Sequence, residues 1–328
     1  MKKLNVLITG AGGAAAIAFY QSVKCMDINV FMADMSPHST GLYLVKPANR
    51  YLLKAADEAE FIDDLFQLCI NNDMDVLIPT VDSELLKVTK NSHLFENNGI
   101  KVVSSSYAAI SNVLDKYKLM TCLENEFKLA WFKNYDADLD VNDLVFPCLS
   151  KPRCDSGSRG IKIIELAEDL ASLPLDDSYM IQEFLPGKEY SVDVYLNEEN
   201  HAIASVVRER VKIYGGVAVV SKTLEMSKLS SLAARIAEHL KLRYAVNVQF
   251  KLNEDGVPCL LEINPRYPGT ISLTVAAGVN MPEMSIREAM GLSLNSYYPY
   301  EEIAMVRYWQ EVFMPINEFQ NQQVGALV

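Results

Sequence analysis

Short apolar runs alternate with helical segments over the first 105 residues, and this alternation constrains the fold more than any other feature of the chain. The expected strands are residues 4–9, 29–33, 75–79 and 101–104, and the expected helices are 14–26, 58–71 and 83–91. Strands that alternate with helices form a parallel sheet covered on both faces. Residues 1–111 are therefore predicted to form a Rossmann-like, doubly wound α/β domain.

The pattern changes after this domain. Residues 107–129 are expected to be mostly helical, and strands are expected at 144–151, 160–165, 179–185, 190–196 and 202–213, followed by a helix at 228–240. Short polar turns between the strands favour antiparallel pairing. The rest of the chain is thus predicted to be α+β, and no Pro/Gly/Ser linker separates it from the first domain.

Residues 244–265 predict a hairpin, because two apolar runs flank the turn-forming residues 253–256. Side chains alternate between the two faces of a strand. On the first strand, Asn247 and Gln249 are expected on the polar face. On the second strand, Cys259, Leu261 and Ile263 are expected to face the core.

This arrangement leaves Glu262 and Asn264 together on the polar face, where strand pairing can bring Gln249 beside them. Carboxylate and amide oxygens suit a hard cation such as Mg²⁺. Arg266 follows at once and could meet phosphates that the metal bridges. The alternative is a half-solvated hairpin whose outer face is simply polar.

Two further segments could contact a nucleotide. Residues 149–160 read L-S-K-P-R-C-D-S-G-S-R-G, so a strand that ends at Lys151 leads into a loop whose small residues let backbone N–H groups approach phosphate. This is not a Walker A loop. Residues 179–189 read as a strand and a Pro-Gly turn that can present backbone amides to adenine, with Glu189 placed for ribose hydroxyls. A flexible hairpin tip and a simple strand with a turn are the alternatives.

The three segments together resemble the ATP-grasp superfamily, in the branch similar to the carbamoyl phosphate synthase large chain. The resemblance covers residues from about 112 to 292 and is weaker over the first 111. It implies a pre-ATP-grasp domain at 1–111, a two-lobed ATP-grasp domain at 112–292 with a mobile lid at about 120–188, and a C-terminal extension at 293–328.

The resemblance also implies roles for individual residues. The glutamate and asparagine of the family's E-x-N-P-R motif hold the metal ions, and its arginine contacts phosphate, which assigns Glu262, Asn264 and Arg266. Gln249 matches a further metal or phosphate ligand, so the predicted metal ligands are Gln249, Glu262 and Asn264. The lysine of the phosphate loop K-P-x-x-x-x-G-S-x-G contacts the α- and β-phosphates, which assigns Lys151.

The hinge of the family assigns the Glu183 carbonyl and the Leu185 N–H to adenine and Glu189 to ribose. The family also places a basic residue over the nucleotide, at Lys116. The full set of predicted ATP contacts is Lys116, Lys151, Ser158, Gln182, Glu183, Phe184, Leu185, Glu189 and Gln249. Asp193 also fits the family pattern, but the sequence supplies no role for it.

The resemblance predicts a ligase of class EC 6.3 that uses ATP and Mg²⁺, or Mn²⁺, to activate a carboxylate as an acyl phosphate. An amine or another nucleophile then captures the acyl phosphate. Arg266 and Lys151 are the predicted catalytic residues, together with Arg210, which we expect to bind the carboxylate substrate or the acyl phosphate. Small-molecule substrates are therefore the expected partners.

Two other functions compete with this one. Residues 10–15 read G-A-G-G-A-A after a strand, and Asp34 ends the next strand, which fits the dinucleotide fingerprint of an NAD-dependent enzyme. The same turn could instead hold an anionic substrate at a helix N-terminus. A regulatory subunit that binds ATP without ligation is the third hypothesis, although the intact Lys151, Glu262 and Asn264 favour an enzyme.

The net charge of −12 argues against nucleic acid as a partner, and the apolar runs are too short to span a bilayer. The six cysteines are scattered without metal spacing, which favours a reducing cytoplasm. The aromatic residues at 297–300 and 308–309 are expected to pack in the core or to form a homodimer contact.

Overall fold

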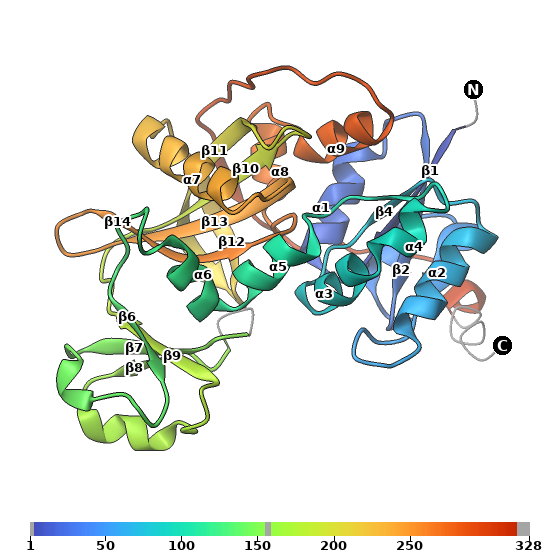
Figure 1. The fold of residues 1–328 in the computed structure, drawn as a ribbon. Coiled ribbons are helices and arrows are strands. Elements are labelled where there is room, and N and C mark those ends of the chain that lie inside the picture. Colours follow the sequence, from blue (N-terminus) through green and yellow to red (C-terminus); the bar gives the residue numbers. More distant parts are fainter. Residues whose placement is uncertain (1–2, 155–158, 320–328) are drawn as a thin grey trace.

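The computed structural model describes residues 3–154 and 159–319 (Figure 1). The first domain contains a sheet of five parallel strands in the order β3-β2-β1-β4-β5. Its strands are β1 (Leu4–Thr9), β2 (Ile28–Asp34), β3 (Arg50–Leu52), β4 (Val76–Ile78) and β5 (Lys101–Val102). The four predicted strands are confirmed, and β3 was not predicted because it is short and half-buried.

Helices cover both faces of this sheet. They are α1 (Ala14–Val23), α2 (Phe61–Asn71), α3 (Asp82–Lys90) and α4 (Ser92–Glu96), with short 3₁₀ helices η1 (Thr40–Leu44) and η2 (Pro47–Asn49). Successive side chains of β1 point to opposite faces of the sheet. Val6 and Ile8 pack in a cluster with Phe19 of α1, whereas Leu7 packs with Leu65 of α2. The domain is therefore doubly wound, as predicted.

The second domain is built on a six-stranded sheet in the order β14-β13-β10-β11-β12-β15, with every pair antiparallel. Its strands are β10 (Glu189–Leu196), β11 (Ala202–Tyr214), β12 (Val217–Thr223), β13 (Tyr244–Leu252), β14 (Pro258–Asn264) and β15 (Ala304–Val306). The predicted hairpin is β13–β14. Strand β15 comes from the segment after residue 293, which we expected to be an extension, so part of that segment completes this sheet.

One face of the large sheet is apolar and the other is polar. Val192, Val194 and Val248 belong to a buried cluster that includes Leu229 and Ile236 of helix α7 (Ser227–His239). The paired register puts the polar residues on the opposite face, in neighbouring positions on adjacent strands. That polar row is Glu189, Ser191 and Asp193 on β10, Arg208 and Arg210 on β11, Asn247 and Gln249 on β13, and Glu262 and Asn264 on β14.

A β-bulge in β14 corrects part of the predicted alternation. Gln249 pairs with Glu262 but Phe250 pairs with Leu260, so Leu261 has no partner of its own. Leu260 and Ile263 therefore enter the core cluster, whereas Leu261 packs in a small separate cluster with Cys259. The prediction that Leu261 and Cys259 face the main core was wrong, because an extra residue in one strand shifts the side chains that follow it.

A smaller sheet of four strands lies below the large one in Figure 1, in the region predicted to be the lid, and is called the lid from here on. Its strands are β6 (Phe132–Tyr135), β7 (Cys148–Pro152), β8 (Lys162–Ile164) and β9 (Tyr179–Glu183), in the order β6-β9-β7-β8. The short 3₁₀ helices η3 (Val141–Asp143) and η4 (Ala167–Ser172) lie in its connections. The sheet has its own buried cluster, so it is a distinct layer.

Helices α5 (Tyr107–Leu114) and α6 (Lys116–Leu123) connect the first domain to the lid. The segment 107–129, predicted to be mostly helical, forms two helices separated at Asp115, whose backbone is extended with φ −92° and ψ 108°. Its side chain accepts hydrogen bonds from the N–H groups of Tyr117 and Lys118, which caps α6. Leu119 and Leu123 of α6 pack in the apolar cluster of the large sheet, so α6 is anchored to the body of the protein.

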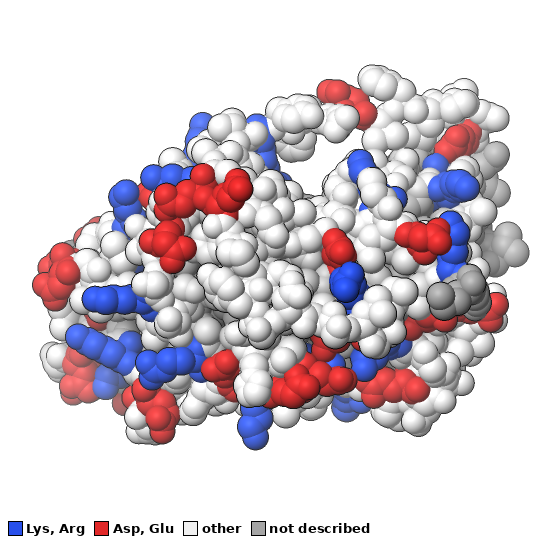
Figure 2. Space-filling model, turned by 90° about the horizontal axis from the view of Figure 1, so that it is seen from above, with Lys and Arg blue, Asp and Glu red and all other residues white. Residues whose placement is uncertain are grey.

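The chain then returns to the first domain. After α8 (Ile271–Ala276), α9 (Met281–Ala289) and β15, Glu318 lies 2.7 Å from the Arg50 guanidinium. The ring of Phe319 stacks on Tyr43 with centroids 5.9 Å apart. In the part of the chain that the structure describes, no helix has the length and apolar character needed to cross a membrane. The face in Figure 2 carries acidic and basic side chains interspersed with one another.

Candidate nucleotide and metal site

A cavity of about 440 Å³ lies between the lid and the polar face of the large sheet. The lid contributes Leu149, Lys151 and Ile161, and the hairpin between β11 and β12 contributes Gly215 and Gly216. Seven of the predicted site residues line this cavity: Lys151, Glu189, Arg210, Gln249, Glu262, Asn264 and Arg266. Residues separated by more than a hundred positions in the sequence are thus brought to one place.

The predicted metal ligands are neighbours on β13 and β14. Gln249 is directly opposite Glu262, and Asn247 is opposite Asn264. Asn264 donates to Glu262 Oε1 over 3.2 Å, and Gln249 donates to Asn247 Oδ1 over 3.2 Å. Within the described residues, no group of three or more His, Cys, Asp or Glu side chains could hold a metal ion.

One carboxylate with neighbouring amide oxygens fits a Mg²⁺ ion that takes its other ligands from a nucleotide and water. Mg²⁺ takes oxygen ligands and is usually held by one or two carboxylates plus substrate phosphates and water. Glu262, half-buried at the cavity wall, supplies the carboxylate, and Asn264 and Gln249 supply amide oxygens. The residues therefore fit a metal that shares its ligands with a nucleotide, and do not fit a metal held by protein carboxylates alone.

Lys151 is almost fully buried, with 3% of its surface exposed. Its Nζ donates to Gln182 Oε1 over 2.7 Å and to the Leu261 carbonyl over 2.9 Å. Burial lowers the pKa of the Lys151 ammonium to about 7, with Glu262 acting in the opposite direction and Lys116 adding to the decrease. Lys116 Nζ lies 3.9 Å from Glu262 Oε2, so both lysines and the glutamate form one charged group.

The predicted hinge lies along the edge of this site. The Glu183 backbone N–H donates to the Trp131 carbonyl over 3.0 Å, and Leu185 packs with Ala130 and Cys259. Glu183, Phe184 and Leu185 do not line the 440 Å³ cavity, so their contacts to adenine stay predictions. The side-chain oxygen of Gln182 accepts a hydrogen bond from Lys151 Nζ. The predicted Ser158 lies outside the described residues.

Glu189 and Arg210, which we predicted to bind different ligands, lie against each other. Arg210 Nε is 2.7 Å from Glu189 Oε1, and Arg210 Nη2 donates to the Gly216 carbonyl over 2.9 Å. The Arg210 Nε–H is not aimed at any hydrogen-bond acceptor, so the pair is close but poorly directed. Burial raises the pKa of Glu189 and lowers the pKa of Arg210, which shows that both charges are partly desolvated.

Arg266 joins the first domain to the cavity. Its guanidinium makes two hydrogen bonds to the Asp82 carboxylate, Nε to Oδ1 over 2.7 Å and Nη2 to Oδ2 over 2.6 Å. Asp82 is the first residue of α3. Two parallel bonds fix the plane of the guanidinium. Sequence reasoning did not link Asp82 to Arg266, because the two are 184 positions apart.

Asp193, for which sequence reasoning found no role, is the centre of a buried hydrogen-bond network next to the cavity. It accepts from Arg208 over 2.6 and 2.8 Å, from Asn247 over 2.7 Å and from Thr274 over 2.5 Å. Arg208 is completely buried and also donates to Thr270 over 2.6 Å. The network therefore fixes Asn247 and Thr270, which both line the cavity. The arginine and aspartate on adjacent expected strands were the only signal in the sequence.

Arg307 is a second residue that sequence reasoning missed. It follows β15 and donates a hydrogen bond to the carbonyl of Gly269, a residue of the cavity wall. Burial lowers the pKa of its guanidinium, and the nearby Arg208 adds to the decrease. Within the described residues, Arg307 has no ion pair, in contrast to Arg208, Arg210 and Arg266. No motif marks it, because the pairing of β15 with β12 places it beside Gly269 of the cavity wall, although Arg307 itself does not line the cavity.

The glycine turn of the first domain has a different geometry. The Gly12 N–H, which an anion or dinucleotide would use, donates to Asp34 Oδ2 over 2.8 Å. Gly10 has φ +65°, and a Cβ there would lie 2.2 Å from the Val81 side chain. Packing and a left-handed backbone therefore explain Gly10 without a ligand. The expectation that this turn binds NAD or an anionic substrate does not fit, because the chain's own carboxylate takes the donor.

Two family models match the chain. Residues 176–312 match the family described as ATP-grasp in the biosynthetic pathway with Ter operon, and residues 6–103 match the PylC-like N-terminal domain. Among curated proteins, the carbamoyl phosphate synthase large chain of Thermoanaerobacter sp. (strain X514) is 24% identical over 220 residues, which cover 60% of this chain and 20% of that protein. The chain thus corresponds to a fifth of this relative's length.

Solved structures resemble this chain over most of its length. N5-carboxyaminoimidazole synthetase from Staphylococcus aureus complexed with ADP has a TM-score of 0.76 at 17% identity and covers 94% of this chain and 83% of its own. L-amino acid ligase from Bacillus licheniformis has a TM-score of 0.69 at 16% identity and covers 88% and 75%. At these identities the likeness shows a shared fold.

Proposed function

We propose that this chain, which joins a PylC-like N-terminal domain to an ATP-grasp domain, is an ATP- and magnesium-dependent ligase that activates a carboxylate. In the proposed reaction the carboxylate attacks the γ-phosphorus of ATP and forms an acyl phosphate with release of ADP. An amine or another nucleophile then attacks the acyl carbon and releases phosphate. The substrates are small molecules.

One observation carries this proposal: a single cavity contains a buried lysine from the lid, a carboxylate–amide cluster from the large sheet and the guanidinium groups of Arg210 and Arg266. Phosphoryl transfer depends on positioning and on neutralising phosphate charge, and does not need a protein nucleophile. A cavity with this composition suits it, because Lys151 can contact the phosphates while Glu262 holds the metal. In the comparisons, the named activities of ligases with the same fold agree with this chemistry.

The nucleotide is proposed to lie between the lid and the large sheet. Lys151 and Lys116 bind its phosphates, and Glu262, Asn264 and Gln249 hold Mg²⁺ or Mn²⁺. The metal would supply charge neutralisation at the β- and γ-phosphates when bound. The amides of Asn264 and Gln249 are oriented by their bonds to Glu262 and Asn247, so the ligand oxygens are in place before the nucleotide arrives.

The carboxylate substrate is proposed to bind at the other end of the cavity, near Arg210, Arg266 and Arg307. Arg210 and Arg266 line the cavity but are paired with carboxylates of the chain, whereas Arg307 lies behind the cavity residue Gly269 and adds a further positive charge at this end. Arginine binds carboxylates and phosphates with a forked geometry.

The scattered free cysteines agree with a cytoplasmic location. A homodimer through Tyr308 and Trp309 stays a prediction.

The ligase is preferred to the two other hypotheses for different reasons. An NAD-dependent enzyme would use the turn at Gly12, whose N–H is already bonded to Asp34. A regulatory ATP-binding subunit would share the nucleotide site but would release no ADP. Substrate-dependent ADP release therefore separates this alternative from the ligase.

The test measures thermal unfolding with ATP, ADP or NAD, each with and without Mg²⁺, and then ADP release with pools of carboxylates and amines. A ligand that binds only the folded protein raises the midpoint, and the stabilisation grows with the logarithm of the ligand concentration above the Kd. We expect a magnesium-dependent rise with ATP, and ADP release that requires both a carboxylate and a nucleophile. A rise with NAD alone, or no response to MgATP, would contradict the proposal.

A further inference from the structure

We propose that Arg153 is a positioning residue for the ligase reaction: by clamping the lid to helix α6, it holds Lys151 and Lys116 in one arrangement around the nucleotide phosphates. The inference rests on the proposed function, because it assigns both lysines to ATP. Arg153 is two residues beyond Lys151, at a position that the phosphate-loop pattern K-P-x-x leaves unspecified. It needs a separate physical explanation.

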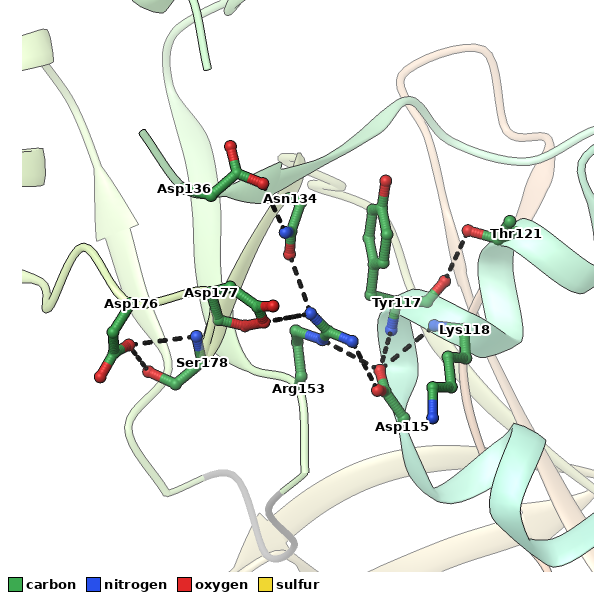
Figure 3. A network of polar contacts seen from close by, with 10 residues as sticks. All are labelled: Asp115, Tyr117, Lys118, Thr121, Asn134, Asp136, Arg153, Asp176, Asp177 and Ser178. Carbon is green, nitrogen blue, oxygen red and sulfur yellow. Dashed lines mark hydrogen bonds and ion pairs between the residues drawn. The ribbon is translucent and has the colours of Figure 1, made fainter. Parts of the chain in front are cut away.

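Arg153 reaches from the lid to the start of α6 (Figure 3). Its Nε donates to Asp115 Oδ1 over 3.2 Å, and its Nη2 donates to Asp115 Oδ2 over 2.7 Å. The guanidinium also lies over the ring of Tyr117, 5.2 Å from its centroid. A forked ion pair with an aromatic ring beneath it fixes both the position and the plane of the guanidinium.

The same guanidinium also holds the lid side. Its Nη1 donates to Asn134 Oδ1 over 3.3 Å, to the Asp177 carbonyl over 3.1 Å and to the Asp177 carboxylate. Asn134 is in β6, and Asp177 lies two residues before the start of β9 (Figure 3). Arg153 therefore ties two lid segments and the start of α6 to one another.

Backbone bonds extend the clamp to both lysines. The Lys116 N–H donates to the Arg153 carbonyl over 2.9 Å, and the Arg153 N–H donates to the Ser178 carbonyl over 2.9 Å. The segment that carries Lys151 is thereby joined directly to the residue that carries the second lysine. A shift of the lid relative to α6 would change the separation of Lys151 and Lys116.

Asp115 has two functions in this arrangement. It caps α6 through the N–H groups of Tyr117 and Lys118, and it pairs with Arg153. Burial alone would raise the pKa of the Asp115 carboxyl, but the hydrogen bond from Arg153 and the bonds from the α6 amides hold the pKa below its ordinary value. The pair is thus ionised at neutral pH and is largely screened from water, with 14% and 10% of the two side chains exposed.

Arg153 follows the Pro152 end of β7, and the hinge follows the Glu183 end of the neighbouring strand β9, so the two are at opposite ends of this strand pair. Between them, Lys151 Nζ donates to the Leu261 carbonyl and Gln182 Nε2 donates to the Leu260 carbonyl, over 2.9 and 3.3 Å. Binding of Lys151 to phosphate, as proposed, would change the first of these contacts. Arg153 does not line the cavity, so it can hold the lid while the contacts of Lys151 change.

The experiment compares four variants of the full chain: Arg153→Met, Arg153→Lys, Asp115→Asn and the double variant Arg153→Met/Asp115→Asn. Asn keeps the helix cap but not the charge, so Asp115→Asn separates capping from clamping. Lys133→Met is the matched control, because Lys133 is a lid cation in an exposed pair 3.8 Å from Asp143. The Kd for MgATP is measured by calorimetry below the unfolding midpoint, and hydrogen exchange of residues 116–123 is followed with and without MgATP.

We expect Arg153→Met and Asp115→Asn each to raise the Kd for MgATP about tenfold, because supporting partners of ligand-binding groups typically contribute factors of this size. The double variant should match Arg153→Met, since Asp115→Asn changes only a partner whose contact Arg153→Met has already removed. Arg153→Lys should fall between, because lysine keeps the charge but not the fork. MgATP should no longer fully protect residues 116–123 in Arg153→Met, while Lys133→Met should behave like the wild type.

Two results would overturn the inference. A purely structural role would lower the unfolding midpoint of Arg153→Met and leave the Kd of the folded protein unchanged. Additive effects of the two substitutions would show that Arg153 and Asp115 act separately. If instead the wild type does not bind MgATP, the proposed function itself fails, so the two failures are distinguishable.

Discussion

Two places in this molecule match patterns for phosphate binding, and they differ in what their donors already contact. In the glycine turn after β1, the Gly12 N–H is bonded to Asp34. In the cavity of the second domain, Lys151 is buried with only a carbonyl and an amide oxygen as hydrogen-bond partners. In the glycine turn, the N–H donor is already bonded to a carboxylate of the chain. In the cavity, the buried Lys151 ammonium is a desolvated cation that a phosphate can stabilise.

The comparison teaches that a glycine pattern describes the shape of a backbone and not the availability of its donors. Gly10 is needed for its positive φ and for the close approach of Val81, whatever the turn binds. In the cavity, the charged side chains themselves create the capacity for an anion and a metal. Four predictions test this difference, from the largest expected effect to the smallest.

The largest effect should come from Asp193→Asn, which removes the counter-ion of the fully buried Arg208. An uncompensated buried charge costs about 3 kcal/mol or more. We expect the free energy of unfolding, measured with urea, to fall by about 3 kcal/mol. Asp143→Asn, in an exposed ion pair with Lys133, is the control and should change stability by less than about 0.5 kcal/mol. Equal effects of the two variants would contradict the importance of the network.

Glu262→Gln should cause the next largest effect, because it removes the only carboxylate among the proposed metal ligands. We expect magnesium-dependent ATP turnover to fall by a factor of about 100 while the protein stays folded. Glu254→Gln, at the exposed turn of the same hairpin, is the matched control and should retain full activity. Unchanged turnover in Glu262→Gln would contradict the assignment of Glu262 as a metal ligand.

Affinity for MgATP should depend on pH through Lys151. Burial places its pKa at about 7 in the empty cavity, and phosphate favours the protonated form, so binding takes up a proton when the pH is above this value. The Kd should therefore rise between pH 7.5 and 9, by at most about tenfold per pH unit. Calorimetry in buffers of different ionisation enthalpy measures the uptake directly.

Lys151→Arg provides the control for this pH dependence, because arginine stays protonated over the whole range. In this variant the proton uptake should disappear, whatever the absolute affinity. Proton uptake of the same size in Lys151→Arg and in the wild type would assign the titration to another group.

Asp34→Ala should have the smallest effect and is the direct test of the glycine turn. Loss of the acceptor for the Gly12 N–H should lower stability by about 1 kcal/mol. The Kd for MgATP should stay within about twofold of the wild-type value, because distant sites are usually independent. A large loss of ATP affinity would show that the turn belongs to the nucleotide site after all.

Much of the fold could be predicted from the sequence, because it follows from local periodicity. The predicted order of a Rossmann-like domain and an ATP-grasp domain is confirmed. Alternation also identified Gln249, Glu262 and Asn264 as neighbours, which the strand register confirms. The bulge at Leu261 was missed, because nothing in a two-residue period signals an inserted residue.

The contacts that were missed are all long-range. Asp82 with Arg266, Asp115 with Arg153, and Arg307 with Gly269 join segments that no local pattern relates. Each residue alone looks like an ordinary charged residue of a helix end or a loop. Only the three-dimensional arrangement shows that these side chains connect the first domain, the lid and the last strand to one cavity.

The return of the chain to the first domain has a consequence for biosynthesis. Arg50 and Tyr43 are contacted by Glu318 and Phe319, residues that leave the ribosome long after the first domain has emerged. The Arg50 charge of the first domain therefore lacks this counter-ion until residue 318 has been synthesised. Domains generally fold in the order of synthesis. A nascent chain stalled before residue 304 would lack both β15 and the contacts that Glu318 and Phe319 make with the first domain. Ribosome-bound intermediates of this protein should be more accessible to proteases around residues 43–50 than the released chain.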